Sequence, residues 1–352
     1  MYTVFSLWDT FRALHPLFTI TQQERTNDLI KSMLDMYDKG GLLPVWELAA
    51  NETWCMIGYH SVPVIFDAYV KGIRGYDVDL AYEAMIKSSM QEREGLGYYR
   101  EYGYIPAGKD GSSVSKTLEY AYDDWCIAMM GKDLGHPEDY ADYIQRAQYY
   151  KNLFNKETGF MRGRMNGMWV SPFDPVEVNF MLTEANTWQY NFFVPQDVSG
   201  LMDLYDGANG FAQKMDDMFN ASMEMSGRHQ SDITGLIGQY AHGNEPSHHM
   251  AYLYNFAGQA WKTQALVRKI MAEQYSEKPD GLCGNEDCGQ MSAWYVLSAM
   301  GFYPVTPGME YYVTGSPIFD KIIIHLENGN NCVIEAKNNS DKNVYIQSAT
   351  LN

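Results

Sequence analysis

The chain has 352 residues, of which 46% are hydrophobic and 14% aromatic, and its formal net charge is -18 at pH 7. This length can bury a sizeable core in one large domain, or in one large and one small domain. The negative charge argues against nucleic acid or an anionic membrane as a partner, and no apolar run approaches the ~20 residues that span a bilayer. We expect a globular protein whose ligand is neutral or cationic, or includes a divalent cation.

The five cysteines indicate neither a disulfide framework nor a zinc site. They are Cys55, Cys126, Cys283, Cys288 and Cys332. Their number is odd, and they lack the paired C-x-x-C or Cys/His spacing that a structural zinc ion requires.

The first segment with recognisable chemistry is Leu7–Pro16, where Trp8 and Asp9 are adjacent and Arg12 follows. A Trp ring can cover the apolar face of a sugar, and a carboxylate can accept hydrogen bonds from its hydroxyls. The same residues also fit an ordinary helix start with an Asp cap and an Arg on the solvated face. Taken alone, the segment favours the structural interpretation.

A helix is predicted over Thr21–Lys39, with Thr as its cap and glycines at its end. Six polar or aromatic side chains then precede a second predicted helix, Val62–Lys71. They are Trp46, Glu47, Asn51, Glu52, Trp54 and His60. This grouping exceeds what turn chemistry needs. Functional and structural interpretations are about even, although a single His60 would more often be a satisfied core residue.

Further helices follow without strands between them. The predicted ranges are Tyr76–Gln91, Ser112–Met130, Pro137–Leu153, Asp197–Tyr205, Gly210–Met225, His248–Phe256 and Trp261–Gln274, with a loop over Gly95–Gly111. Helices joined by glycine-rich loops predict helical hairpins packed in sequence rather than a sheet with crossovers. Short β-branched segments after Tyr303 predict a small β region. Its strands are expected at Tyr311–Thr314, Lys321–Leu326, Asn331–Ala336 and Asn343–Ile346.

Glu184 is a candidate acid in the segment L-T-E-A-N-T-W-Q-Y. Its neighbours Ala185 and Trp188 should partly desolvate it, and desolvation raises a carboxyl pKa toward the range where the group can donate a proton. The alternative is an ordinary Glu in the first turn of a helix. We favour function, because the neighbouring Asn, Gln and Trp supply no obvious core.

The segment A-H-G-N-E-P-S-H-H groups potential metal ligands within eight positions: His242, Asn244, Glu245, His248 and His249. The spacing matches no zinc motif, and Asn and Glu oxygens together with backbone carbonyls suit Ca²⁺ better. The structural alternative is that Ser247 caps a helix over His248–Phe256 and that the histidines pair with carboxylates.

The stretch Gly281–Met300 joins an acidic loop to a helix. Asn285, Glu286 and Asp287 lie between glycines, and apolar residues then recur at helical spacing. This arrangement fixes the carboxylates at the positive end of a helix. It indicates either an ordinary cap or a rigidly held catalytic carboxylate, and the local sequence alone favours the cap.

Five ordered motifs, spread over nearly the whole chain, together resemble glycoside hydrolase family 92, the calcium-dependent exo-acting α-mannosidases. The motifs are WDTFR, NETWCMIGYH, TEANTWQY, HGNEPSHH and GNEDCGQMSAWYVLSAMGFYPV. The resemblance implies a mainly α fold, an (α/α)6 toroid that an N-terminal β-sandwich precedes in the family. We expect the toroid at residues 1–302, a short β region at 303–352, and no β-sandwich in this chain, whose abrupt ends suggest a piece of a longer protein.

The resemblance also implies hydrolysis of terminal α-mannosides, such as those of high-mannose N-glycans, with inversion. Inversion needs a protonated acid and an ionised base about 6.5–9.5 Å apart. Glu184 matches the family's acid and Asp287 its base. Some members carry a second acidic residue where this chain has Asn285, so Glu286 is an alternative base.

Calcium is the cofactor that the resemblance implies. A hard cation bound to O2 and O3 of mannose can help distort the ring and stabilise an oxocarbenium-like transition state. Asn244 and Glu245 are the predicted metal ligands. The mannose subsite is predicted to be lined by Trp8, Asp9, Trp46, Glu47, His60 and Trp188.

The family's bacterial members are mostly exported, which implies a periplasmic or cell-surface location.

Two other functions stay open. One is a non-catalytic glycan-binding fragment, which a shared cleft between Glu184 and Asp287 would argue against. The other is a different inverting toroid glycosidase, such as a trehalase-like hydrolase, which calcium-dependent hydrolysis would argue against.

Overall fold

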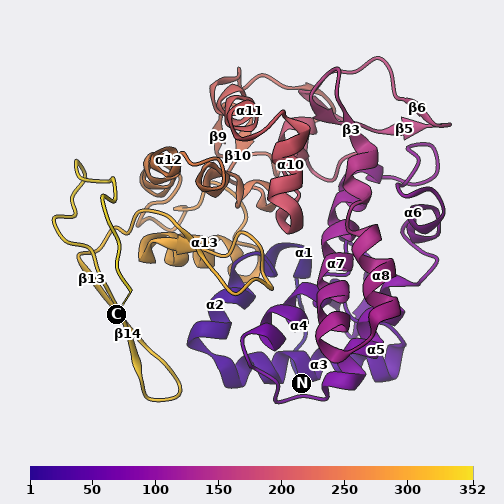
Figure 1. The fold of residues 1–352 in the computed structure, drawn as a ribbon, viewed down its shortest axis with the longest axis horizontal. Helices are drawn as coiled ribbons and strands as arrows, with labels where there is room; N and C mark the ends of the chain where they lie inside the picture. Colours follow the sequence, from indigo (N-terminus) through magenta and orange to yellow (C-terminus); the bar gives the residue numbers. More distant parts are fainter. Residues whose placement is uncertain (352) are drawn as a thin grey trace.

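The structure, a computed structural model, describes residues 1–351 and consists mainly of α-helices (Figure 1). In chain order the α-helices are α1 (Leu7–Thr10), α2 (Leu14–Thr21), α3 (Gln23–Gly40), α4 (Ser61–Val70), α5 (Val78–Ser89), α6 (Leu96–Tyr102), α7 (Ser113–Leu134), α8 (Pro137–Arg146), α9 (Thr187–Tyr190), α10 (Val198–Leu204), α11 (Ala208–Asn220), α12 (Ala260–Glu273) and α13 (Gln290–Met300). Short 3₁₀ helices are η1 (Tyr149–Leu153), η2 (Pro195–Asp197), η3 (Glu245–Ser247), η4 (Met250–Asn255) and η5 (Asp287–Gly289).

The helices form a closed ring. Helix α2 packs on α3, α3 on α4 and α5, and α5 on α7, while α12 packs on α13 and α13 returns to α2. The backbone N–H groups of Ala13 and Leu14 donate to Oε1 of Gln290 at 2.9 and 3.3 Å, which fixes this closure. The architecture is the (α/α)6 toroid expected from the sequence, and α1 lies near its middle in Figure 1.

The strands are short and pair in twos. The pairs are β1 (Glu47–Leu48) with β2 (Asn51–Glu52), β3 (Phe154–Asn155) with β4 (Phe160–Met161), β5 (Arg164–Met165) with β6 (Met168–Trp169), β7 (Glu177–Val178) with β8 (Ser226–Gly227), β9 (Leu236–Ile237) with β10 (Tyr240–Ala241), β11 (Phe302–Tyr303) with β12 (Val313–Thr314), and β13 (Lys321–His325) with β14 (Asn331–Glu335). Within residues 1–351 no sheet has more than two strands, so a β-sandwich is not among the described elements. The hairpin of β13 and β14 lies at one edge of the ring, in yellow in Figure 1.

Helix α7 is buried on all sides. Eighteen of its 22 residues are buried, including the acidic residues Glu119, Asp123 and Asp124. The predicted helix Ser112–Met130 is confirmed. A helix without a solvated face must satisfy its polar side chains inside the protein, so these three carboxylates need buried partners.

Two predictions about helix ends near the first half of the ring are wrong. Thr21 does not cap a helix: it is the last residue of α2, and its hydroxyl donates back to the Leu17 carbonyl at 3.0 Å. Because α2 occupies Leu14–Thr21, the next helix, α3, begins at Gln23. The predicted loop Gly95–Gly111 contains α6, because Gly95 and Gly103 adopt left-handed φ angles of +74° and +73° and cap it at both ends.

Two predicted elements in the second half also differ. The expected helix His248–Phe256 is replaced by 3₁₀ turns, and the Ser247 hydroxyl accepts from the Ala241 N–H at 3.4 Å instead of capping. Residues Asn343–Ile346 do not form a strand. Their backbone pairs with side chains: Val344 accepts from the Ser316 hydroxyl at 2.7 Å, and Ile346 donates to Gln264 at 3.1 Å.

The β region after residue 302 begins inside the toroid. The ring of Tyr303 stacks on that of Tyr252 with their centroids 4.8 Å apart, and β11 packs against α13. A domain boundary between residues 302 and 303 stays a prediction.

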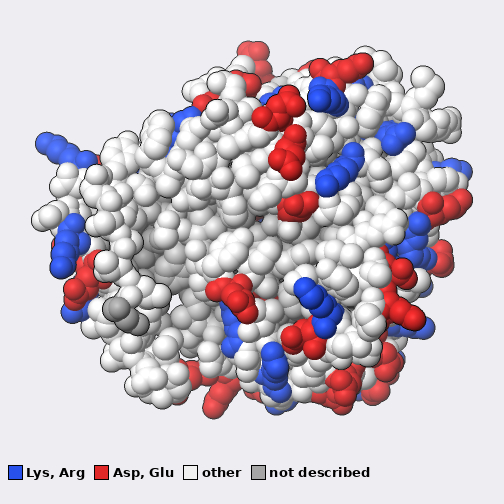
Figure 2. All heavy atoms as spheres, viewed as in Figure 1, with Lys and Arg blue, Asp and Glu red and all other residues white. Residues whose placement is uncertain are grey.

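No helix in the described part of the chain is long and apolar enough to cross a membrane, and the five cysteines are free. On the face in Figure 2, basic side chains are scattered among acidic ones.

Candidate active site

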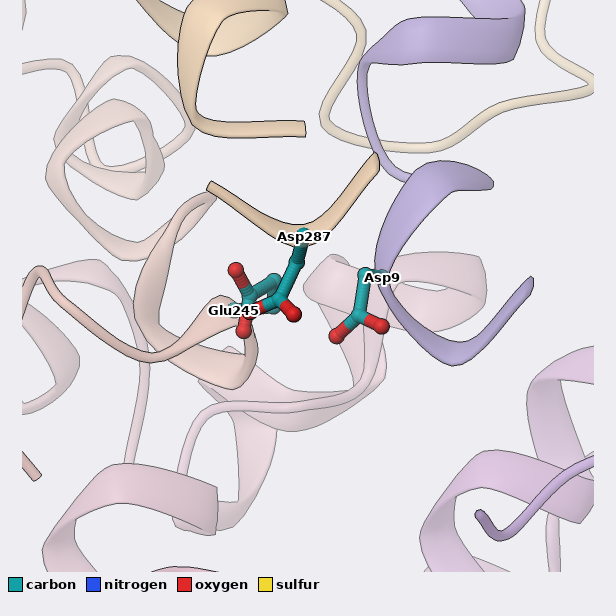
Figure 3. Close-up of side chains that lie close together, drawn as sticks. All are labelled: Asp9, Glu245 and Asp287. Atoms are coloured by element: carbon teal, nitrogen blue, oxygen red, sulfur yellow. The ribbon is translucent and has the colours of Figure 1, made fainter. Parts of the chain in front are cut away.

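Three carboxylates from distant parts of the chain meet at one point: Asp9, Glu245 and Asp287. One oxygen of each lies within 4.8 Å of the others. Helix α1 carries Asp9, η3 carries Glu245 and η5 carries Asp287, and α1 packs against η5. Figure 3 shows the three side chains entering from separate elements and converging. We call this group the carboxylate cluster.

Two members of the carboxylate cluster are buried and Asp287 is partly exposed, and the three charges repel one another. Asp9 is 2% exposed and Glu245 0%. Burial, followed by the charge of Asp287, raises the pKa of Asp9 to about 8. Burial also raises the pKa of Glu245 and that of Asp287. Buried carboxylates at this spacing stay ionised only if a cation compensates them.

The donor set of the carboxylate cluster fits a hard divalent cation. All its ligating atoms are oxygens, which is the chemistry that calcium prefers. Among residues 1–351, neither carboxylate oxygen of Glu245 has a hydrogen-bond partner, although both are buried. A buried acceptor without a donor is costly, and a bound cation would satisfy both oxygens.

A chain of hydrogen bonds orients Asp9. The Ser6 hydroxyl donates a short hydrogen bond to Oδ2 of Asp9, and Trp46 Nε1 donates to the Ser6 oxygen at 2.8 Å. Trp46 is half-buried, so it reaches the carboxylate cluster through one hydroxyl. The neighbouring Glu47 is buried and accepts from the Phe5 N–H at 3.0 Å.

In the loop before α13, the adjacent carboxylates of Glu286 and Asp287 have different roles. Glu286 accepts a short hydrogen bond from the Gly289 N–H and a second from the Ser292 N–H at 3.1 Å, so it is the cap. Asp287 and Cys288 adopt left-handed φ angles of +49° and +55°, which cost on the order of 1–3 kcal/mol each for non-glycine residues. The cap and this strained backbone turn Asp287 toward Glu245 and Asp9.

Glu184 is the second predicted catalytic carboxylate, and it also has strained backbone, with φ +47°. It lies in a turn before α9, and its carbonyl accepts from Asn244 Nδ2 at 2.9 Å. Burial and then the charge of Asp232 raise the pKa of Glu184 to about 7, and the charge of Asp287 acts in the same direction. Glu184 and Asp287 are therefore within electrostatic range of each other.

A capping box holds the segment that carries Glu184. The Asn186 side-chain oxygen accepts from the Trp188 N–H at 3.1 Å, and Gln189 Oε1 accepts from the Asn186 N–H at 2.8 Å. Asn186 Nδ2 also donates to Gln239 Oε1 at 2.7 Å. The Asn and Gln that distinguish this motif in the sequence thus act structurally, because they fix the start of α9 next to Glu184.

Three residues predicted to line a mannose subsite are buried: Trp8 at 1%, His60 at 0% and Trp188 at 9% exposure. Trp8 and His60 both donate to Glu119, and Trp188 packs edge-on against Phe160 with ring centroids 4.6 Å apart. Contact between these side chains and a sugar stays a prediction. Asn244 precedes Glu245 in the chain, and its Nδ2 donates to the Glu184 carbonyl at 2.9 Å; its role as a metal ligand stays a prediction.

Two residues that the sequence analysis did not assign to a site stand close to it. Asp232 accepts from Asn285 Nδ2 at 3.1 Å, and its charge raises the pKa of both Glu184 and Asp287. Arg12, expected on a solvated face, is buried, and its Nε donates to the Trp8 carbonyl at 2.8 Å. No local pattern distinguishes an isolated Asp, and only the adjoining Trp and Asp could have drawn attention to Arg12.

The sequence model of the glycosyl hydrolase family 92 catalytic domain matches residues 1–352. A curated relative from Arthroderma benhamiae, described as an uncharacterized secreted glycosidase, is 31% identical over an alignment of 369 positions, which covers 92% of this chain and 46% of the relative.

Solved structures are also similar. A family GH92 α-mannosidase from Bacteroides thetaiotaomicron, in complex with mannoimidazole, has a TM-score of 0.94 and 47% identity, covering 98% of this chain and 47% of that one. A family GH92 inverting mannosidase from Bacteroides thetaiotaomicron VPI-5482 has a TM-score of 0.88 and 40% identity, covering 97% and 48%. The chain spans about half the length of these relatives.

Proposed function

Because the chain belongs to glycosyl hydrolase family 92, we propose that it carries the catalytic centre of an exported, inverting exo-α-mannosidase. Its substrates would be α-mannosides with a terminal mannose, such as high-mannose N-glycans. The similar structures are of α-mannosidases, one of them inverting, and the curated relative is a secreted glycosidase.

The observation that carries the proposal is the pairing of two unlike carboxylates. Glu184, with a pKa raised to about 7, and Asp287 come from segments about a hundred residues apart, and the charge of Asp287 contributes to the raised pKa of Glu184. Both are held by left-handed backbone. A protonated acid next to an ionised base is what inverting glycoside hydrolysis requires.

In this mechanism Glu184 is the general acid. Its raised pKa keeps a large fraction of the carboxyl groups protonated near neutral pH. The proton passes from Glu184 to the oxygen of the leaving sugar as the glycosidic bond breaks. Glu184 is then a carboxylate, and solvent returns its proton before the next turnover.

Asp287 is the general base. It removes a proton from the water that attacks the anomeric carbon on the face opposite the leaving group, which gives the inverted product, and it then releases this proton to solvent. Asp9 and Glu245 are almost completely buried, whereas Asp287 is partly exposed, so water can reach Asp287 most easily. Glu286 is occupied as the cap of α13, which argues against it as the alternative base.

Asp9 and Glu245 would hold calcium, with one oxygen of Asp287 facing the same space. Calcium bound there would supply positive charge that keeps the buried carboxylates ionised and favours an oxocarbenium-like transition state. Ser6 and Trp46 orient Asp9 for this contact. Asn244 remains a predicted ligand, although its amide is used to hold Glu184.

The test is release of mannose from α-mannobiosides by this chain, with calcium and with a chelator. We expect release with calcium and a loss of at least about tenfold with chelator, because removal of the cation leaves three repelling carboxylates. Activity should return when calcium is added back. Equal turnover in chelator would contradict the cofactor, and hydrolysis of trehalose in place of mannobiosides would favour a different toroid glycosidase.

The same assay on the full-length protein separates two causes of failure. If only the full-length protein releases mannose, the function holds but needs more than this chain. If neither does, while the chain binds mannose in calorimetry, the chain is a glycan-binding module.

The alkaline limb of the pH profile tests the acid. Activity needs protonated Glu184, so kcat/KM should fall as pH rises through about 7. Asp232→Asn removes a negative charge that raises the pKa of Glu184 and keeps an acceptor for Asn285. We expect the alkaline limb to move to lower pH by roughly one unit. The exposed Asp280→Asn is the control, and a limb that stays in place in Asp232→Asn would contradict the assignment.

A further inference from the structure

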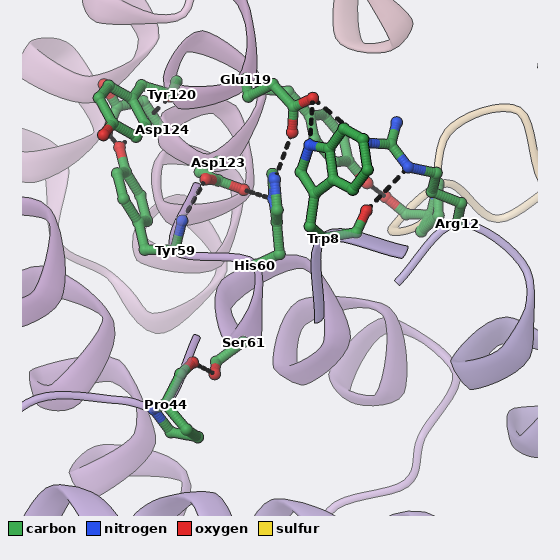
Figure 4. Close-up of polar contacts among 12 residues, drawn as sticks. Trp8, Arg12, Pro44, Tyr59, His60, Ser61, Glu119, Tyr120, Asp123 and Asp124 are labelled. Atoms are coloured by element: carbon green, nitrogen blue, oxygen red, sulfur yellow. Dashed lines mark hydrogen bonds and ion pairs between the residues drawn. The ribbon is translucent and has the colours of Figure 1, made fainter. Parts of the chain in front are cut away.

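A buried polar network lies beside the carboxylate cluster and centres on Glu119 of α7 (Figure 4). Its Oε1 accepts from Trp8 Nε1 at 3.1 Å and from Arg12 Nη2 at 3.2 Å. The Tyr190 hydroxyl donates to the same oxygen at 2.8 Å. His60 Nε2 makes a short hydrogen bond to the other oxygen, Oε2. One carboxylate therefore has four partners from three parts of the chain.

The network contains two positive and two negative groups. His60 Nδ1 lies 2.8 Å from Asp123 Oδ1, one turn further along α7, so the imidazole bridges two carboxylates. Burial lowers the pKa of His60, but Asp123 and Glu119 overcome this effect and raise it to about 9. His60 is therefore a cation at neutral pH. Together with Arg12 it balances Glu119 and Asp123.

Stability alone is a weak explanation for such a network. All four charged groups are buried. Taking ions out of water costs several kcal/mol each, and well-packed apolar side chains often replace buried ion pairs without loss of stability. What the network does supply is fixed geometry, because every oxygen and ring nitrogen has a directed partner.

The partners of Glu119 flank both halves of the candidate active site. Trp8 precedes Asp9 in α1, and Arg12 also binds the Trp8 carbonyl. Tyr190 is the last residue of α9, the short helix that begins just after the Glu184 turn. A single oxygen of Glu119 thus holds the segment of Asp9 and the segment of Glu184 to one buried helix.

We propose that Glu119 is a positioning residue that sets the placement of Asp9 relative to Glu184, with His60 fixing the orientation of its carboxylate. The inference rests on the proposed mannosidase function for its catalytic readout. It assigns His60 a role without sugar contact, and it gives α7, which carries none of the proposed catalytic residues, a part in the reaction.

The chain offers a matched control on the same helix. Asp124 is as buried as Glu119 and pairs with Arg146 at 2.8 and 2.9 Å, and it accepts from Tyr59 and Tyr99. None of these partners flanks Asp9 or Glu184, although the Tyr59 N–H also donates to Asp123 at 3.0 Å. A change at Asp124 therefore removes a comparable buried ion pair without touching either half of the site.

The test compares Glu119→Gln with Asp124→Asn in the full-length protein. A Gln amide is uncharged, so it no longer forms an ion pair with Arg12, and its NH₂ group keeps a hydrogen bond to His60 only if the imidazole gives up its Nε2 proton. We expect both variants to lower Tm. Only Glu119→Gln should lower kcat, by about 10- to 100-fold with KM changed much less, because small displacements of catalytic groups are costly.

Crystal structures of the same variants give a readout that does not need activity. Glu119→Gln should displace Asp9 relative to Glu184, and Asp124→Asn should not, even if the protein hydrolyses no mannoside. If Glu119→Gln does not fold, Tyr190→Phe removes one donor and should show a smaller loss of kcat with the same displacement. Unmoved Asp9 and unchanged kcat in the folded variant, or an equal loss of kcat in Asp124→Asn, would overturn the proposal.

Discussion

Glu184→Gln is expected to lower kcat for α-mannobiosides by about 10³-fold, within the range that a general acid contributes. The amide keeps the size of the side chain but cannot donate the proton that the leaving sugar needs. The protonated acid acts mainly in the transition state, so the Kd for mannose should stay within about threefold of wild type. Steady-state kinetics and calorimetry measure the two quantities.

The leaving group provides the control for this variant. A dinitrophenyl α-mannoside leaves without protonation, so Glu184→Gln should lose much less activity on it than on a mannobioside. An equal loss on both substrates would indicate damage to the site rather than loss of an acid. Full activity on the mannobioside would rule out Glu184 as the acid.

Asp287→Gly should also lower kcat, by about 10³-fold, but on activated and natural substrates alike, because the missing base acts on water. Glycine suits the left-handed φ of +49° at this position, so the loop should keep its conformation. The space left by the carboxylate lets azide attack without a base. We expect azide to restore turnover of the dinitrophenyl substrate and to give the β-mannosyl azide.

Glu286→Gln is the companion control for the base. Glu286 caps α13, so this change should cost about 0.5–2 kcal/mol of stability and leave kcat near wild type. A collapse of kcat in Glu286→Gln, together with an active Asp287→Gly, would move the base to Glu286. Calcium affinity by calorimetry distinguishes loss of the base from loss of the metal, because Asp287 also faces Asp9 and Glu245.

The sequence was sufficient for the helical character of the fold, which depends on local patterns, while the toroid followed from the resemblance to glycoside hydrolase family 92, and the site residues stay predictions. Helical periodicity located α7 and α13, and the carboxylates Glu184 and Asp287 stand in short distinctive motifs. The raised pKa of Glu184 followed from its apolar neighbours, and burial is indeed its first cause. Thr21 was wrongly assigned as an N-cap because the sequence analysis did not predict α2, the helix that ends at this residue.

What the sequence could not provide is contact between distant segments. Trp8 and His60 have the chemistry of sugar ligands, yet both face Glu119, more than fifty residues away from either. Asp9 was expected at the sugar, and its nearness to Glu245 and Asp287 emerges only when the ring closes. Glu119 itself lies in a buried helix without a motif, so nothing local indicated its four partners.

The hydrogen bonds between Gln290 and the backbone at Ala13 join residues 277 positions apart, and this has a consequence for biosynthesis. A ribosome adding about 5–20 residues per second needs roughly 15 to 55 seconds between the two. During that interval α2 has emerged without α13, so its apolar face lacks its final cover. Until the segment of η5 and α13 has been made, Asp287 is absent and cannot approach Asp9. Until α13 has been made, the carboxylate cluster cannot form, and exposed apolar surface of this kind favours aggregation.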